Sequence, residues 1–306
     1  MNSALDFLFE DDPFGKSLRA YCEGLLAQLD VAPLTKSFFA CRRQGHVPDD
    51  IHAPCAALGY FPDGFYPADT FFAPARRLFD RVQLPHAIGF MAVYYAMLPT
   101  TGLLYKQYNV PEDIFHKTAS LWRQAVESCY RKNGYWGIED YVELASFFIP
   151  ELYPVGSLQM RLCAFPYEDI TFPGGCVKYG QPVIQVHVPQ GADISRPMLQ
   201  AAYDRACDLF GIRLFMADSW LLFPAHAQML PVDSAIRDFM SDYSIFRSET
   251  TQNYEGLWRV FGKRNAYRAS DLPTHTSLQR AYAARVAAGL PIGSGVGLFC
   301  YTGEAH

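Results

Sequence analysis

A histidine and a glycine-containing turn lie together in the C-terminal half of the chain. His187 is near the end of the apolar run Val183–Val188, and the polar stretch Pro189–Ile194 follows. A neutral imidazole near the end of a strand can act as a general base that takes a proton from a substrate. The alternative is a histidine whose ring is hydrogen-bonded beneath a neighbouring helix, and the sequence leaves both roles open.

The stretch after His187 has the composition of an anion-binding turn. Pro189 cannot donate a hydrogen bond to a strand ladder, so it ends the run. Gly191 lets the backbone approach a ligand closely. A helix pattern follows Ser195, and the free N–H groups and positive dipole end of a helix start attract phosphate. An ordinary capped helix start explains the same residues, so the phosphate interpretation remains a hypothesis.

A second apolar run, Ile212–Ala217, is followed by Asp218 and Ser219. Either side chain can cap the helix that comes next, or point toward a ligand that lies across the strand ends. A serine nucleophile would require a G-x-S-x-G elbow, which is not present around Ser219. The late segment GLPIGSGVG follows a helix and precedes a strand, which is the reverse of a P-loop, so helix termination and close sheet packing explain its glycines.

Four potential zinc ligands, Cys41, His46, His52 and Cys55, occur in a loop-rich stretch. Of the spacings between them, that of His52 and Cys55 alone resembles a zinc knuckle, and none of the eight cysteines forms a CxxC pair. We therefore expect no metal, and a zinc-dependent enzyme in the N-terminal half is the least favoured hypothesis.

Composition excludes several classes of protein. The chain has 306 residues, half of them apolar, which suits two globular domains. Its net charge of −5 and the absence of a Lys/Arg run argue against a nucleic-acid partner. The apolar segment Ala87–Leu98 is too short to span a bilayer as a helix, so no membrane partner is expected. The acidic start lacks the features of a signal peptide, and we expect a cytoplasmic protein.

Periodicity divides the chain near Pro150. Residues 1–150 show the apolar spacing of helices, which are expected at Gly15–Leu29, His86–Leu98, Pro111 to about Arg131, and Ile138–Phe148. Residues 151–306 show short strand-like runs mixed with helices. The elements expected there are strands at Leu158–Phe165, Cys176–Tyr179, Val183–Val188, Ile212–Ala217, Tyr243–Phe246, Leu257–Phe261 and Val296–Tyr301, with the second and third forming a hairpin, and helices at Ser195–Phe210, around Leu230, at Ser234–Met240 and after Thr276. This order predicts an α+β protein whose second domain has a mixed sheet with helices on its faces.

Several strings of the second half resemble a family of bacterial acyltransferase-like proteins. These proteins have a helical N-acyltransferase N-terminal domain and a GNAT-like (Gcn5-related N-acetyltransferase) C-terminal domain with a central twisted sheet. The strings that carry the resemblance are YPVGSLQMRL, VIQVHVPQGADIS, MADSWLLFPAHAQMLPVDSAIRDFMSDYSIF and THTSLQRAYAARVAAGLPIGSGVG. The resemblance implies a helical domain over residues 1–150 and a GNAT-like domain over residues 151–306.

The resemblance also implies a co-substrate, acetyl-CoA or another acyl-CoA, held between two strands that splay apart. Those strands would be Val183–Val188 and Ile212–Ala217, with the CoA diphosphate at the loop Pro189–Ile194. The family loop reads Gln/Arg-x-x-Gly-x-Gly/Ala, and Gln190–Gly191–Ala192 supplies part of it. The cofactor-binding residues implied in this way are Val186, Val188, Gln190, Gly191, Ala192, Asp193, Ile194 and Asp218.

In such a site an amine attacks the thioester, a base takes the amine proton and a tyrosine often protonates the leaving thiolate. His187 is the expected base, and Tyr254 or Tyr301 the candidate acid. Ser219 is a further catalytic candidate, and Glu249 and Glu255 could attract a cationic amine. The acceptor is expected to be a small-molecule amine, and the oligomeric state stays open. The alternative is an inactive protein that binds a small molecule on the same scaffold.

Overall fold

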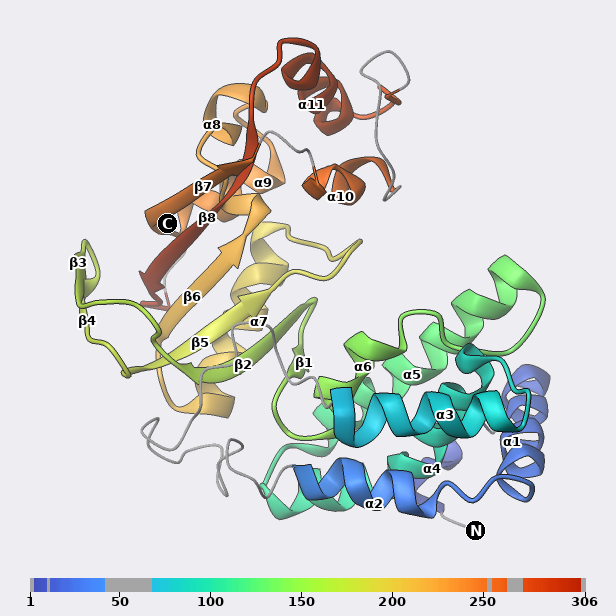
Figure 1. Cartoon of the computed structure of the whole chain (residues 1–306). Helices are drawn as coiled ribbons and strands as arrows, with labels where there is room; N and C mark the ends of the chain where they lie inside the picture. Colours follow the sequence, from blue (N-terminus) through green and yellow to red (C-terminus); the bar gives the residue numbers. More distant parts are fainter. Residues whose placement is uncertain (1–2, 10–11, 42–67, 252–254, 263–271, 304–306) are drawn as a thin grey trace. The chain divides into compact units, whose positions relative to one another are not determined.

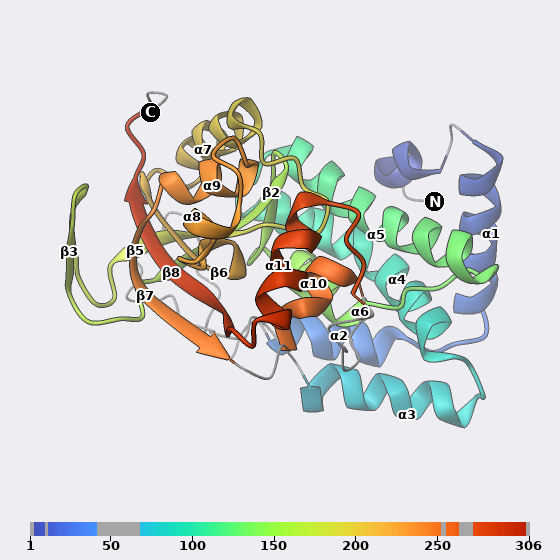
Figure 2. The ribbon, with the colours of Figure 1, turned by 90° about the horizontal axis from the view of Figure 1, so that it is seen from above.

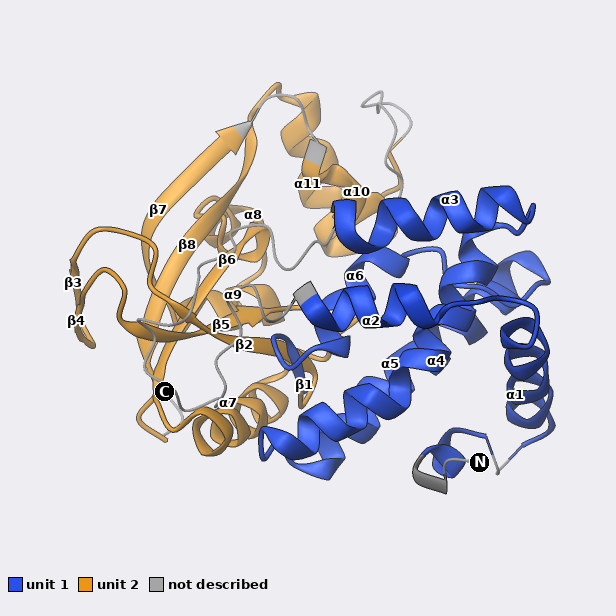
Figure 3. Cartoon of the chain, turned by 60° about the horizontal axis from the view of Figure 1, so that its bottom comes forward, with its two compact units in different colours: residues 1–154 blue, residues 155–306 orange. Residues whose placement is uncertain are grey.

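The computed structural model describes residues 3–9, 12–41, 68–251, 255–262 and 272–303. The chain divides into two compact units, residues 1–154 and 155–306 (Figure 3). The first unit is helical, and the second contains a mixed sheet flanked by helices (Figure 1). The fold is therefore α+β, as the order of the predicted elements indicated.

The first unit is built around α4 (His86–Gln107), which packs against α1, α2, α3, α5 and α6. Its buried aromatic side chains include Phe90 and Tyr94, and the Trp122 indole of α5 donates to the Met91 carbonyl at 3.2 Å. The remaining elements of the unit are η1 (Ser3–Leu8), α1 (Pro13–Leu26), α2 (Ala32–Cys41), η4 (Ala68–Phe72), α3 (Ala73–Arg81), α5 (Glu112–Asn133) and α6 (Tyr141–Phe148).

The predicted helix His86–Leu98 was too short, because α4 continues through Pro99 to Gln107. A proline inside a helix removes one backbone hydrogen bond but does not end the helix when neighbouring elements pack along its length. By length and composition α4 is the one described helix that could cross a membrane, and half of its apolar window is buried inside the unit. The core helix of a compact helical unit passes the same test.

The second unit contains a six-stranded sheet in the order β1-β2-β5-β6-β8-β7. β5 and β6 are parallel and are joined through α7, whereas β2, β8 and β7 pair antiparallel with their neighbours. Seen from above, α7, α8 and α9 gather on one face of this sheet (Figure 2). The sheet strands are β1 (Tyr153–Val155), β2 (Leu158–Ala164), β5 (Pro182–His187), β6 (Leu214–Ser219), β7 (Ser244–Thr251) and β8 (Ile292–Cys300), and the helical elements are α7 (Arg196–Phe210), η5 (Trp220–Leu222), α8 (His226–Met229), α9 (Ala235–Ser241), η6 (Glu255–Leu257), α10 (Trp258–Phe261) and α11 (Ser277–Ala287).

The two faces of the sheet bury different rows of side chains. Phe215 and Phe299 are stacked at 4.9 Å between ring centroids, and both lie against Tyr203 of α7. On the other face, Met216 and Leu298 belong to a cluster that Phe165 covers from the segment after β2. Alternation along the strands produces this division, since successive side chains point to opposite faces.

Two strand predictions were wrong. β4 (Gly175–Val177) pairs with β3 (Ile170–Phe172) in a separate two-stranded sheet, whereas β5 pairs antiparallel with β2. The β3–β4 ribbon is thus an insertion between two paired strands. The predicted strand 257–261 is instead η6 and α10, because Leu257 and Phe261 at a spacing of four face one small core with Tyr282.

Candidate functional site

The parallel strands β5 and β6 stay together over a short length. They pair at two positions, Ile184 opposite Phe215 and Gln185 opposite Met216. β5 continues to pair with β2 as far as His187, and β6 continues to pair with β8 as far as Ser219. Each strand therefore follows its outer neighbour, and the two ends separate where their mutual pairing stops.

A cavity of about 630 Å³ opens where these strands part. It brings together His187 from β5 with Asp218 and Ser219 from β6, and Glu249 from β7 lies on the same wall. The sequence placed Asp218 and Ser219 after the strand, but both belong to β6. The full lining comprises Val186, His187, Val188, Asp218, Ser219, Trp220, Glu249, Thr250, Gly256, Trp258, Arg259, Ile292, Gly293 and Ser294.

A second cavity, of about 340 Å³, lies at the turn after β5. The Ala192 N–H donates to the Pro189 carbonyl at 3.1 Å, and Gly191 has a φ of 78°. Positive φ at the third residue is the requirement of a type II turn, which glycine meets without strain. The cavity is lined by Val188, Pro189, Gln190, Gly191, Ala192, Ile194, Trp220, Leu221, Ile236, Trp258, Arg259 and Leu278. Four of these residues also line the larger cavity, namely Val188, Trp220, Trp258 and Arg259.

The cavity residue His187 is held neutral at physiological pH. Loss of water and, to a smaller extent, the positive charge of Arg161 together lower its pKa from 6.5 to about 4. Arg161 is itself buried and donates to the Gln185 side chain at 2.6 Å, one row behind His187 on the same face. A neutral imidazole is the form that can accept a proton, and a pKa of about 4 makes this ring a weak base.

The part of the cavity formed by β6 and β7 carries negative charge. Burial raises the pKa of Asp218, the nearby Glu249 raises it further, and Arg247 opposes both. Arg247 donates to Glu249 at 3.1 Å, which leaves the Asp218 carboxylate to face the cavity. Carboxylates in a partly desolvated cavity favour a cation, so this wall suits an ammonium group.

The other predicted site residues have separate positions. The Ser219 hydroxyl accepts from the Leu221 N–H at 3.2 Å and so caps η5, although Ser219 also lines the larger cavity. Asp193 lines neither cavity: its carboxylate accepts from the Ser195 N–H at 2.9 Å, and its carbonyl accepts from the Ser157 hydroxyl at 2.6 Å. Tyr301 donates to Asp204 at 2.9 Å, away from both cavities.

Six candidate side chains lie outside the described parts of the chain. Tyr254, and the ligand candidates His46, His52 and Cys55, lie outside the described residues. The structure describes the backbone of Glu255 in η6 but not its side chain, and the same holds for Cys41 in α2. Within the described parts of the chain, no group of three His, Cys, Asp or Glu side chains could hold a metal ion.

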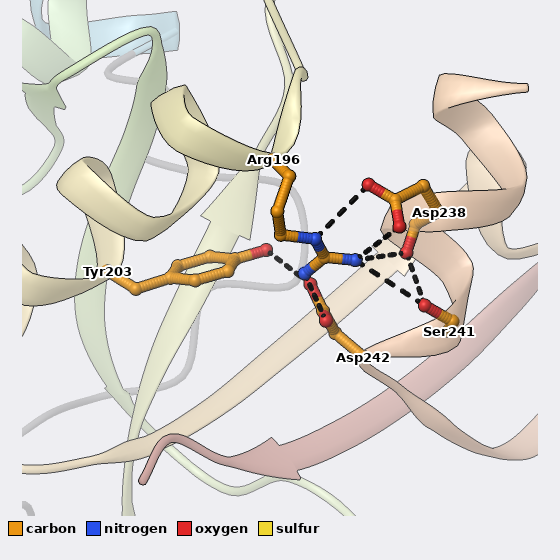
Figure 4. A network of polar contacts seen from close by, with 5 residues as sticks. All are labelled: Arg196, Tyr203, Asp238, Ser241 and Asp242. Carbon is orange, nitrogen blue, oxygen red and sulfur yellow. Dashed lines mark hydrogen bonds and ion pairs between the residues drawn. The ribbon is translucent and has the colours of Figure 1, made fainter. Parts of the chain in front are cut away.

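A charged network fixes the start of α7 beside the turn (Figure 4). Arg196, the first residue of α7, donates to the Asp238 carboxylate at 2.7 Å and to Asp242 at 2.6 Å. Tyr203, two turns further along α7, donates to the other Asp242 oxygen at 3.4 Å. The network ties α7 to α9, so the orientation of the helix that follows the turn is set from outside the turn itself.

The sequence did not identify Arg259 or the two tryptophans that flank it in the cavities. Trp220 follows β6, and Trp258 and Arg259 open α10. The Arg259 guanidinium lies over the Trp258 ring, 4.8 Å from its centroid. The sequence predicted a strand at residues 257–261, and that prediction gave no reason to expect Trp258 and Arg259 beside the ends of β5 and β6. The helical spacing of Leu257 and Phe261 was the signal that could have corrected it.

Comparisons with known proteins agree with this architecture. Residues 152–299 match the family described as GNAT-like C-terminal domain. Comparison with curated proteins gives no match. Three structural neighbours are crystal structures described as an acyltransferase.

The first, in complex with decanoyl-CoA, is 22% identical, covers 81% of this chain and 73% of its own, and has a TM-score of 0.58. The second, with CoA and 10C-teicoplanin, is 22% identical, covers 70% of this chain and 67% of its own, and has a TM-score of 0.56. The third, with decanoyl-CoA and teicoplanin, is 23% identical with the same coverages and a TM-score of 0.55.

At these identities the structural neighbours show the fold, and the family match carries the assignment. The match covers all six strands of the sheet except Cys300 at the end of β8, together with the β5–turn–α7 unit and both cavities. Residues 152–299 therefore form a GNAT-like domain, which follows a helical N-terminal unit.

Proposed function

We propose that this protein is an acyl-CoA-dependent acyltransferase that moves an acyl group to a small-molecule amine. The observation that carries the proposal is the cavity at the parting of β5 and β6, continuous through shared residues with a second cavity at the turn. A thioester placed between the strand ends would face His187 on one side and Asp218 on the other. The decanoyl-CoA and CoA ligands of the structural neighbours support this choice of co-substrate.

The charges of the larger cavity suggest how an amine would be used. Asp218 and Glu249 attract the substrate as an ammonium ion. The amine must lose a proton to attack the thioester carbonyl, and the neutral His187 ring is a proton acceptor in the same cavity. Attack then expels the CoA thiolate and leaves an amide. Teicoplanin in the complexes of two structural neighbours supports the broader class of acceptor, a small molecule.

Binding of CoA or acetyl-CoA is expected to raise the melting temperature of the protein. A ligand that binds the folded state and not the unfolded chain stabilises the folded state by mass action, by about 2.7 kcal/mol at a hundredfold excess over Kd. Differential scanning fluorimetry over a CoA titration measures this shift. Absence of a shift at millimolar CoA would contradict the proposal.

Replacing His187 with alanine is expected to lower kcat by about 100-fold, while the Kd for CoA changes little. General base catalysis contributes 10²–10⁴-fold in enzymes of this kind of chemistry. Because the pKa of His187 is about 4, the wild-type rate at a fixed concentration of unprotonated amine should stay flat from about pH 6 to pH 8. Release of free thiol from acetyl-CoA reports the rate.

The matched control for this variant is His275→Ala, which removes an exposed histidine outside both cavities. Equal rates for His187→Ala and His275→Ala would show that His187 is not the general base. CoA binding without thiol release, for any amine offered to the wild-type protein, would favour the alternative of an inactive binding protein on this scaffold.

A further inference from the structure

Arg259 is a cation that lines both cavities, and its guanidinium has no hydrogen-bond acceptor among the described parts of residues 155–306. Most arginines of residues 155–306 donate to such acceptors, among them Arg161, Arg196, Arg213, Arg237, Arg247 and Arg285. Among the side chains described in 155–250, 256–262 and 272–303, none forms a hydrogen bond or ion pair with Arg259. Its contact is with the face of the Trp258 ring.

The cavity walls withdraw Arg259 partly from water. The side chain reaches the mouth of the cavities and stays exposed, yet the walls withdraw enough water to lower its pKa, with a small opposing influence from Tyr282. A guanidinium that loses water without gaining an acceptor is destabilised unless an anion joins it. The carboxylates of the larger cavity do not serve this purpose, since Glu249 pairs with Arg247 and neither Glu249 nor Asp218 influences Arg259.

The wall that faces Arg259 in the smaller cavity is suited to an anion as well. Gly191 leaves open space where a side chain would begin, with no atom within 4 Å of an ideal Cβ. The backbone of Gln190 to Ala192 is therefore accessible from the cavity. A phosphate or diphosphate group in this space would contact the planar guanidinium of Arg259 on one side and the backbone of Gln190–Ala192 on the other. Guanidinium groups bind phosphate oxygens in this bidentate way.

We propose that Arg259 binds the diphosphate of the co-substrate in the cavity that it shares with the turn Pro189–Ala192, and that it selects phosphate-bearing thiols over phosphate-free ones. This inference rests on the acyl-CoA function proposed above. In this subsite α10, which is distant in sequence from the turn, supplies the positive charge that binds the phosphates. Trp258 holds the guanidinium in place by cation–π contact at 4.8 Å.

The test measures binding of three probes by isothermal titration calorimetry: CoA, ADP and pantetheine, which lacks phosphate. Arg259→Ala is expected to weaken CoA and ADP by on the order of 10- to 100-fold, the usual range for a hydrogen bond to a charged group, and to leave pantetheine unchanged. Arg259→Lys, which keeps the charge without the fork, should fall between wild type and alanine. Arg280→Ala, which removes an α11 arginine bonded to backbone carbonyls of Thr274 and His275, is the matched control and should change none of the three.

The outcomes separate this inference from the proposed function. If Arg259→Ala binds CoA as tightly as wild type, or loses CoA and pantetheine by equal factors, the assignment of Arg259 is overturned while the acyltransferase proposal stands. If wild type binds ADP through Arg259 but binds neither CoA nor pantetheine, the phosphate subsite is supported and the acyl-CoA function fails. Unchanged melting temperatures of the variants confirm that the measured losses concern binding.

Discussion

Replacing Gly295 with alanine is expected to destabilise residues 155–306 by about 3 kcal/mol, because added atoms in a packed core cost this much when the backbone cannot move. An ideal Cβ at Gly295 would lie 2.2 Å from the Leu222 carbonyl oxygen. That oxygen belongs to η5, which packs directly on β8. Gly293 meets a similar limit, with its Cβ position 2.1 Å from the Glu249 carbonyl oxygen. The backbone on both sides would have to move, and β6 and the cavity wall would move with it.

Urea unfolding monitored by tryptophan fluorescence measures this loss, since Trp220 and Trp258 both belong to residues 155–306. Gly256→Ala is the matched control. Its Cβ position is 3.5 Å from the Arg259 guanidinium and 3.6 Å from Ile292, which are ordinary contact distances. A Gly295→Ala protein as stable as Gly256→Ala would mean that η5 does not approach β8 as closely as described. The result would also remove the packing explanation of the GLPIGSGVG segment.

Replacing Arg196 with alanine is expected to cost about 3 kcal/mol, since removal of one partner from a buried ion pair leaves the other charge without compensation. Asp242 is that other charge: its side chain is 7% exposed and would keep one hydrogen bond, from Tyr203 at 3.4 Å. Arg196 itself is 23% exposed at the side chain, so the pair is shielded from solvent screening. The start of α7 would also lose its connection to α9, and CoA binding at the adjacent turn should weaken.

The loss in Arg196→Ala should depend on pH. Burial raises the pKa of Asp242 above 3.8, and Arg196 lowers it. Without Arg196 the folded-state pKa rises further above the unfolded value. A group of this kind contributes stability at low pH that is lost as pH rises through the folded pKa. The variant should therefore be closer to wild type at pH 5 than at pH 8.

A second substitution tests the same explanation. Asp242→Asn removes the buried charge, so Arg196→Ala combined with Asp242→Asn should lose less stability than the sum of the two single variants. Chemical denaturation of all four proteins at pH 5 and pH 8 gives the coupling. Additive losses that are equal at both pH values would show that the network in Figure 4 acts through packing and not through charge.

The amino-acid sequence was sufficient for those features that depend on neighbours along the chain. Helical periodicity before Pro150 and strand-like runs after it predicted the α+β architecture. The helix expected after Thr276 is confirmed as α11, and the Thr276 hydroxyl caps it by accepting from the Gln279 N–H at 3.1 Å. The β5–turn–α7 unit with Gly191 at the turn was also recognisable, since turn chemistry and caps are local. These local features predicted the part of the candidate site that His187 and the turn Pro189–Ala192 form.

Tertiary structure alone decided the other walls. β4 pairs with β3 and not with β5, and the local pattern of a short apolar run does not say which strand will be its partner. Residues 257–261 form helical turns because Leu257 and Phe261 are buried against Tyr282 and Ile292. The parting of β5 and β6 depends on which outer strand each one follows. The histidine and the turn that first suggested chemistry therefore form a candidate site only together with Asp218, Glu249 and Arg259, which β6, β7 and α10 bring to the same cavities. Residues so far apart in sequence meet through long-range packing, which no local pattern encodes.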